Sequence, residues 1–174
     1  MMSPNETQLI ERLVTAALER RGVSPAPAAD LTLAEAEAIA ARARAASVAM
    51  GVPVVISVAD ASGAQILFHR MEGSLPASAA LAPGKAWTAA AFRMGTDELG
   101  RMAQPGGMLF GVESTHDGRV VTFGGGMPVR RGDRVVGAVG ISGGTVDEDM
   151  AIARQSLTGI SDELGQSPEE GAER

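Results

Sequence analysis

Histidine, cysteine and tyrosine, three side chains that commonly bind heme iron, are scarce or absent in this sequence. It contains two histidines, His69 and His116, and neither cysteine nor tyrosine. The lack of cysteine excludes disulfides, thiolate zinc sites, iron–sulfur clusters and a cysteine nucleophile. Two histidines cannot form a three-histidine metal site, but either could be an axial ligand to heme iron, a role otherwise left to methionine. The alternative for each is an ordinary packed or surface histidine.

Lys85 is the most distinctive cation, because it lies in an otherwise apolar stretch, PGKAWTAAAF. One interpretation is a surface lysine whose stem packs along the protein. The other is a cation directed at a carboxylate or propionate in a pocket, with Arg70 and Ser142 nearby. In an enzyme for a small carboxylate or carbonyl metabolite, Lys85 and Arg70 would hold the anion. Glu113 or His116 would then move protons.

Two glycine clusters mark places where the backbone could approach a ligand. Gly125 and Gly126 belong to a triple glycine, for which a structural bend is the alternative interpretation. Ser142, Gly143 and Gly144 end an apolar strand directly before a helix. Free backbone N–H groups at that helix start could bind an anionic group. These five residues, with Lys85 and the two histidines, are the predicted cofactor-binding residues.

Composition and motifs exclude several functional classes. The net charge is −6 and no basic stripe occurs, which argues against nucleic-acid binding. No apolar run approaches the roughly 20 residues that span a bilayer, and the N-terminus lacks the pattern of a secretory signal. A cytoplasmic protein is therefore expected. The chain has no serine-hydrolase elbow, dinucleotide fingerprint or Walker sequence.

The order of predicted elements indicates an α+β fold. Capping boxes begin two helices, at Thr32 with Glu35 and at Thr145 with Glu148. Thr96 is predicted to cap a short helix. The predicted strands cover residues 54–59, 65–71, about 119–123, a segment beginning near Pro128, and 135–142. A helical stretch over residues 76–91 is interrupted at 83–84 and could be two pieces. The result is an antiparallel sheet of about five strands with helices packed on it.

Separate segments are predicted on either side of the central domain, which covers residues 31–160. Residues 1–22 are predicted to hold an amphipathic helix, at 6–21, with apolar residues at three- and four-residue spacing. A Pro/Ala linker follows at 23–30, and residues 161–174 form an acidic tail expected to be disordered. The helix and linker resemble the encapsulation peptides that carry cargo into bacterial microcompartments. The alternative is a helix that folds back on its own domain or on a sister subunit.

The central domain resembles the GlcG/HbpS family, which also forms the C-terminal domain of PduO-type cobalamin adenosyltransferases. The matching segments are LTLAEAEAIAARARAASVAMGVPVVISVADASGAQILFHRMEGS, then KAWTAAAF with TDEL, then FGGGMPVRRGDRVVGAVGISGGTVDEDMAIA. The resemblance implies a profilin-like α-β-α sandwich and self-assembly from dimers to octamers. It further implies a role with heme or, as a second choice, a corrinoid. The adenosyltransferase domain of PduO has no counterpart in this sequence, so adenosyl transfer is not carried over.

Three functional hypotheses follow. The first is an oligomeric cofactor-binding protein, for heme or a corrinoid-related group, possible cargo of a microcompartment. The second is the metabolite enzyme described above. The third is a structural cargo or adaptor protein whose residues 6–21 dock to a microcompartment shell protein.

Overall fold

The computed structural model describes residues 30–159 of the 174-residue chain. The predicted N-terminal helix, all but the last residue of the Pro/Ala linker, and the acidic tail lie outside the described residues. Within residues 30–159, none of the helices combines the length and the apolar character that crossing a lipid bilayer requires.

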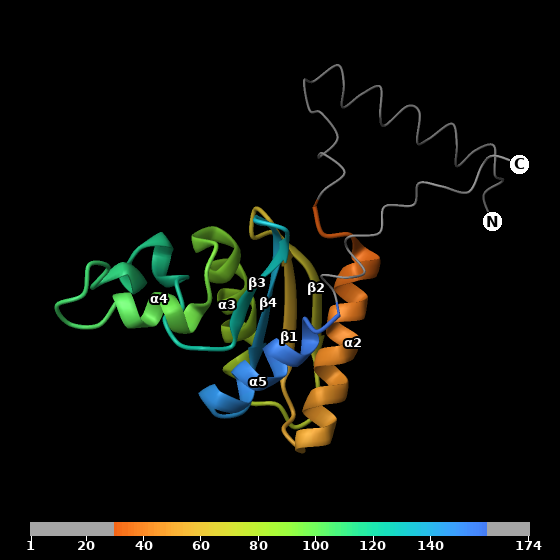
Figure 1. Cartoon of the computed structure of the whole chain (residues 1–174). Coiled ribbons are helices and arrows are strands. Elements are labelled where there is room, and N and C mark those ends of the chain that lie inside the picture. Colours follow the sequence, from red (N-terminus) through yellow and green to blue (C-terminus); the bar gives the residue numbers. More distant parts are fainter. Residues whose placement is uncertain (1–29, 160–174) are drawn as a thin grey trace, which may run out of the picture. The chain divides into compact units, whose positions relative to one another are not determined.

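A four-stranded antiparallel sheet forms the centre of the described chain (Figure 1). Its spatial order is β2-β1-β4-β3. The strands are β1 (Val55–Asp60), β2 (Gln65–Arg70), β3 (Gly126–Arg131) and β4 (Arg134–Ser142). The apolar strand β4 lies inside the sheet between β1 and β3, which fits its nearly complete burial.

The prediction of about five strands is wrong by one, because residues 119–123 do not form a strand. This segment packs against helices instead of pairing with the sheet. The Val121 N–H donates to Thr88 Oγ1 at 3.0 Å, and the Thr122 carbonyl lies where a Cβ of Gly100 would be. The Val121 N–H thus bonds a helix side chain and not a neighbouring strand, a choice that the β propensity of this segment does not reveal.

Both predicted capping boxes are present. Helix α2 (Leu33–Met50) begins at Thr32, whose side chain and that of Glu35 bond each other's backbone N–H. Helix α5 (Val146–Ser156) begins in the same way at Thr145 with Glu148. Each box satisfies two N–H groups that have no partner inside the helix, so both helix starts are set by local sequence.

Helix α3 (Ser78–Phe92) is continuous through Pro83, so the interruption expected at residues 83–84 is absent. A proline inside a helix removes one backbone hydrogen bond. Close packing on the sheet compensates, since a Cβ at Gly140 of β4 would overlap the Ala82 carbonyl of α3. Small residues on both elements therefore let this helix lie almost directly on the strand.

The helices cover both faces of the sheet. Ile56 of β1 belongs to a core cluster with Ala36 and Ile39 of α2 and Ile152 of α5. Successive strand residues point to opposite faces, and the α3 side is marked by Gly140 against α3. Figure 1 shows α2 and α5 on one side and α3 on the other, with the short α4 (Thr96–Met102) beyond it. The predicted α+β sandwich is confirmed.

Candidate functional site

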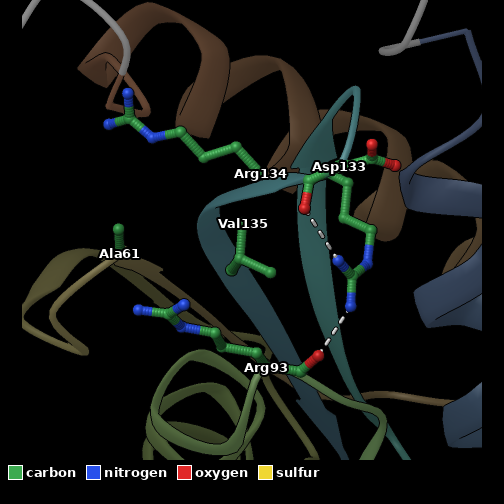
Figure 2. Close-up of a pocket in the computed structure, with 6 residues that line it drawn as sticks. Ala61, Arg93, Asp133, Arg134 and Val135 are labelled. Carbon is green, nitrogen blue, oxygen red and sulfur yellow. Dashed lines mark hydrogen bonds between the residues drawn. The ribbon is translucent and has the colours of Figure 1, made fainter.

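A cavity of about 390 Å³ opens at the turn end of the β3–β4 hairpin (Figure 2). Three arginines dominate its lining, which consists of Ala61, Arg93, Arg130, Asp133, Arg134 and Val135. None of the residues that the sequence predicted for a site lines this cavity. No spacing motif joins these arginines, because they come from the end of α3 and from the hairpin. Only the folded chain brings them together.

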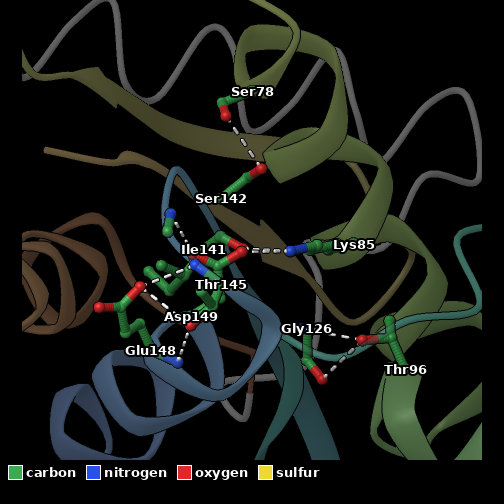
Figure 3. A network of polar contacts seen from close by, with 10 residues as sticks. Ser78, Lys85, Thr96, Gly126, Ile141, Ser142, Thr145, Glu148 and Asp149 are labelled. Carbon is green, nitrogen blue, oxygen red and sulfur yellow. Dashed lines mark hydrogen bonds and ion pairs between the residues drawn. The ribbon is translucent and has the colours of Figure 1, made fainter. Parts of the chain in front are cut away.

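Lys85 lies at the opposite end of β4, in a buried polar network (Figure 3). Its side chain is 0% exposed and is the largest fully buried one within residues 30–159. The ammonium lies 2.7 Å from Asp149 Oδ2 and donates to the Ile141 carbonyl at 2.8 Å. It also lies 4.9 Å from the centre of the Phe123 ring. The surface-lysine interpretation is therefore wrong, and the ammonium already has a carboxylate, a carbonyl and an aromatic face as neighbours.

The ion pair ties three elements together, because Lys85 is on α3, Ile141 on β4 and Asp149 on α5. Burial lowers the pKa of Lys85 below its ordinary value, while the hydrogen bond and the charge of Asp149 oppose that shift. Lys85 is also the only lysine in the sequence, so its titration can be observed without interference from another lysine.

At the end of the Ser142-Gly143-Gly144 turn, two backbone N–H groups donate to carboxylates of the chain itself. The Gly144 N–H donates to Asp149 Oδ1 at 3.0 Å, and the Thr145 N–H donates to Glu148 at 2.8 Å. The hydroxyl of Ser142 donates to Ser78 Oγ at 3.1 Å. Hydrogen bonds from Thr145 lower the pKa of Glu148. The anions expected at this helix start are thus side chains of α5 itself.

The triple glycine provides close packing around the same network. Gly125 has a φ of +114°, and a Cβ there would overlap the Ile141 carbonyl and the Lys85 ammonium. The Gly126 N–H donates to Thr96 Oγ1 at 3.0 Å. The prediction that Thr96 caps α4 is wrong, because the N-cap is Gly95 and Thr96 is the first residue of the helix. Both glycines therefore allow the backbone to pack closely around Lys85 and Thr96.

His69 and Arg70 lie on the edge strand β2 and are exposed. The register pairs His69 with Ile56, so its side chain projects on the α2 side of the sheet. Arg70 pairs with Val55, which in turn pairs with Ser142, so Arg70 and Ser142 share the α3 side two strands apart. The structure therefore places Arg70 in the same cross-strand row as Ser142.

His116 lies in the loop beyond α4, within the short 3₁₀ turn η2 (His116–Gly118). Its ring centroid is 5.2 Å from that of Trp87 and 6.3 Å from that of Phe92, both on α3. Thr115 Oγ1 is 2.8 Å from His116 Nδ1. The backbone of His116 is left-handed, with φ of +52°. The loop residue is therefore oriented by a hydroxyl and two aromatic rings.

The structure places two members of the group proposed for metabolite chemistry, Lys85 and Glu113, in different surroundings. The hydrogen-bond partners of Lys85 are Asp149 and Ile141. Glu113 is exposed in the 3₁₀ turn η1 (Val112–Ser114). Residues 30–159 also contain no group of three or more His, Asp or Glu side chains that could hold a metal ion.

Sequence reasoning missed Asp149, the partner of Lys85. A lone lysine in an apolar helix signals that a carboxylate must be near if the lysine is buried. The acidic run at the start of α5 supplies three candidates, Asp147, Glu148 and Asp149. Choosing among them required the helix rotation, which only the packing of α5 fixes.

Comparisons with known proteins give consistent matches over this domain. The family model described as "Haem degrading protein HbpS-like" matches residues 31–158. The corrinoid adenosyltransferase PduO of Citrobacter freundii is 49% identical over 110 residues, 63% of this chain and 33% of PduO. The chain thus spans about one third of the length of that relative.

Two solved structures share the fold. A crystal structure of the PduOC:heme complex is 41% identical with a TM-score of 0.72, covering 74% of this chain and 93% of that one. The crystal structure of Klebsiella pneumoniae protein ORFY is 37% identical with a TM-score of 0.73. The match covers 77% of this chain and 92% of ORFY. The predicted resemblance to HbpS and to the PduO C-terminal domain is confirmed.

Proposed function

Because the chain belongs to the HbpS-like family, we propose that it is a heme-binding protein. The observation that carries this proposal is its similarity to PduOC, a domain crystallised with heme, along nearly the whole of that domain. Bound heme would supply an iron centre for redox or ligand-binding chemistry. The chain's own contribution would be an axial ligand, an apolar surface for the macrocycle and cations for its carboxylates.

His116 is the axial ligand that the geometry favours. Thr115 engages Nδ1, while Nε2 has no hydrogen-bond partner among the described residues. Histidines that bind metals commonly hydrogen-bond through the other ring nitrogen, which fixes the ring orientation. Heme iron bound at Nε2 of His116 would therefore leave the contact between Thr115 and Nδ1 unchanged.

The surroundings of His116 suit a flat apolar group with acidic substituents. Trp87 lies against its ring, and the preceding loop exposes Met108 to 85% and Phe110 to 64%. Exposed apolar side chains gathered in one segment commonly mark a binding surface. The Arg119 guanidinium carbon lies 4.7 Å from the centroid of the Trp87 ring, and this guanidinium would be available to a heme propionate.

A hemin titration followed by Soret absorbance tests the ligand. We expect a saturable shift in the wild-type protein that is lost in His116→Asn, because asparagine tolerates left-handed backbone but is not a heme ligand here. His69→Asn is the matched control, since it makes the same chemical change on the other side of the sheet. Loss of the shift in His69→Asn alone would move the ligand to β2, and no shift in the wild type would refute heme binding.

A corrinoid is the second cofactor to test, because the relative PduO is described as a corrinoid adenosyltransferase. The proposal covers binding alone, since the match spans only a third of PduO. Absorbance titration with cobalamin under the same conditions compares the two tetrapyrroles directly. If cobalamin binds more tightly than hemin, a corrinoid and not heme is the ligand.

Self-association is part of the proposal, from a dimer to an octamer. The outer face of α2 exposes Leu33 to 57% and Val48 to 67%, and apolar side chains exposed on a helix suit a contact with a second copy. Sedimentation analysis of the wild type and of Val48→Glu tests this. An unchanged oligomer in the variant would place the interface elsewhere, and a monomeric wild type would refute self-association.

Residues 6–21 are proposed to dock to a shell protein of a bacterial microcompartment. The support is the apolar stripe of that segment and its separation from the domain by a Pro/Ala linker. Fusing residues 1–30 to a fluorescent protein and expressing it beside assembled shells tests the idea. Diffuse fluorescence that ignores the shells would contradict both the docking and the compartment localisation.

A further inference from the structure

No histidine lines the arginine cavity at the β3–β4 turn, so this cavity does not supply the axial ligand of the proposed heme site. Three arginines, Arg93, Arg130 and Arg134, line one cavity of a chain whose net charge is −6. Like charges brought together in one cavity repel each other, and an anion bound among them would relieve that repulsion.

Arg130 is held in place by two backbone carbonyls. Its Nη2 donates to the Arg93 carbonyl at 2.6 Å and its Nη1 contacts the Asp133 carbonyl at 3.4 Å (Figure 2). A guanidinium has five N–H donors in a fixed plane, so donors remain after these two contacts. The bond to Arg93 also offsets the negative carbonyl end of α3, which would otherwise repel an anion.

Arg93 is strained and has no acidic partner among residues 30–159. Its φ is +57°, a left-handed conformation uncommon for a long side chain and more easily adopted by glycine. Neither Arg93 nor Arg130 has a carboxylate within ion-pair distance among the described residues. Figure 2 shows Arg93 and Arg134 extending from opposite sides of Val135 toward the Ala61 turn. Local strain at a cavity wall is a feature of binding sites.

We propose that this cavity binds a small anion that bears two or more carboxylate or phosphate groups. Guanidinium forks match the planar geometry of both groups, and a volume of about 390 Å³ lies in the range of small-molecule sites. Asp133 also lines the cavity, but Figure 2 shows its carboxylate on the far side of the turn from Ala61. The acidic groups could belong to a free metabolite or be the propionates of a porphyrin.

Calorimetric titration of the full chain with citrate and with pyrophosphate, at low ionic strength, tests the site. Arg93→Gly is the informative variant, because glycine keeps the left-handed backbone while the guanidinium is removed. We expect saturable binding to the wild type and about tenfold or greater weakening in Arg93→Gly, as for loss of a charged hydrogen bond. Arg154→Gln, an exposed arginine on α5, removes the same charge and should leave the affinity unchanged.

The two sources of the acidic groups are separated by a hemin titration of Arg93→Gly. An unchanged hemin affinity with lost citrate or pyrophosphate binding assigns the cavity to a free anion. A weakened hemin affinity assigns it to propionates. If neither citrate nor pyrophosphate binds the wild type, and Arg93→Gly leaves hemin binding intact, the proposal is wrong. Equal weakening in Arg154→Gln would also overturn it, since net charge would then explain the effect. Because the calorimetry uses no heme, its result is independent of the His116 test.

Discussion

Replacing Lys85 with methionine tests whether the buried ion pair with Asp149 holds α3 to α5. Methionine keeps most of the side-chain volume and removes the charge. Asp149, whose side chain is 4% exposed, would keep its hydrogen bond from the Gly144 N–H but lose its counter-ion. Removing one partner of a buried pair costs about 3–5 kcal/mol. We expect a loss of that size in the free energy of unfolding.

The double variant separates the ion pair from the general effect of a core mutation. Asp149→Asn keeps an oxygen that can accept from Gly144 but leaves the ammonium buried without an opposite charge, so it should also cost about 3–5 kcal/mol. With both changes made together no charge is buried. The double variant should therefore be more stable than the sum of the single losses predicts, by about 2 kcal/mol or more.

Urea unfolding followed by fluorescence and far-UV circular dichroism measures these differences. Trp87 is the only tryptophan, so fluorescence reports on α3 directly. Arg101→Met is the matched control, because the ion pair of Arg101 with Asp97 is also short, at 2.9 Å, but the Arg101 side chain is 69% exposed. Breaking this surface pair should lower the free energy of unfolding by less than about 1 kcal/mol. A loss below about 1 kcal/mol in Lys85→Met, or simple additivity in the double variant, would refute the reasoning.

Three further outcomes follow from the same structure. Because the folded pKa of Lys85 is lowered, the unfolded chain binds more protons between that value and about 10.4. Stability of the wild type relative to Lys85→Met should therefore rise with pH across this window; a flat difference from pH 8 to 10.5 in urea titrations would contradict it. Gly140→Ala should destabilise by about 1–3 kcal/mol or more, because its Cβ would overlap the Ala82 carbonyl, and an unchanged melting temperature would disprove the close packing. Thr145→Ala should cost about 1 kcal/mol through loss of the α5 cap, measured by thermal unfolding beside Thr158→Ala, a threonine outside the cap that should have little effect.

The predicted elements were most accurate where the signal was local. The caps at Thr32 and Thr145 depend on residues three positions apart, and both helices begin where the capping boxes indicate. The β1–β2 hairpin likewise follows from its turn sequence. The strand expected at residues 119–123 failed because its partners, such as Thr88, lie far away in the sequence.

The candidate site could be predicted only in its parts. Lys85 and the two glycine clusters were recognised as unusual, and the structure brings them to one end of β4. Their partner Asp149 is 64 positions from Lys85, and no periodicity relates the two. The arginine cavity had no sequence signal, because its members combine one helix end with one hairpin.

The sequence by itself determined the family, the α+β class, the helix starts and the short list of chemically active side chains. These depend on residue types and on spacings of a few positions, where backbone geometry is nearly fixed. The tertiary structure alone decided which charges are neutralised within the chain and which are left facing a cavity. Burial and pairing depend on contacts between distant segments, so Lys85 became an internal ion pair while Arg93 was left without a carboxylate partner among the described residues.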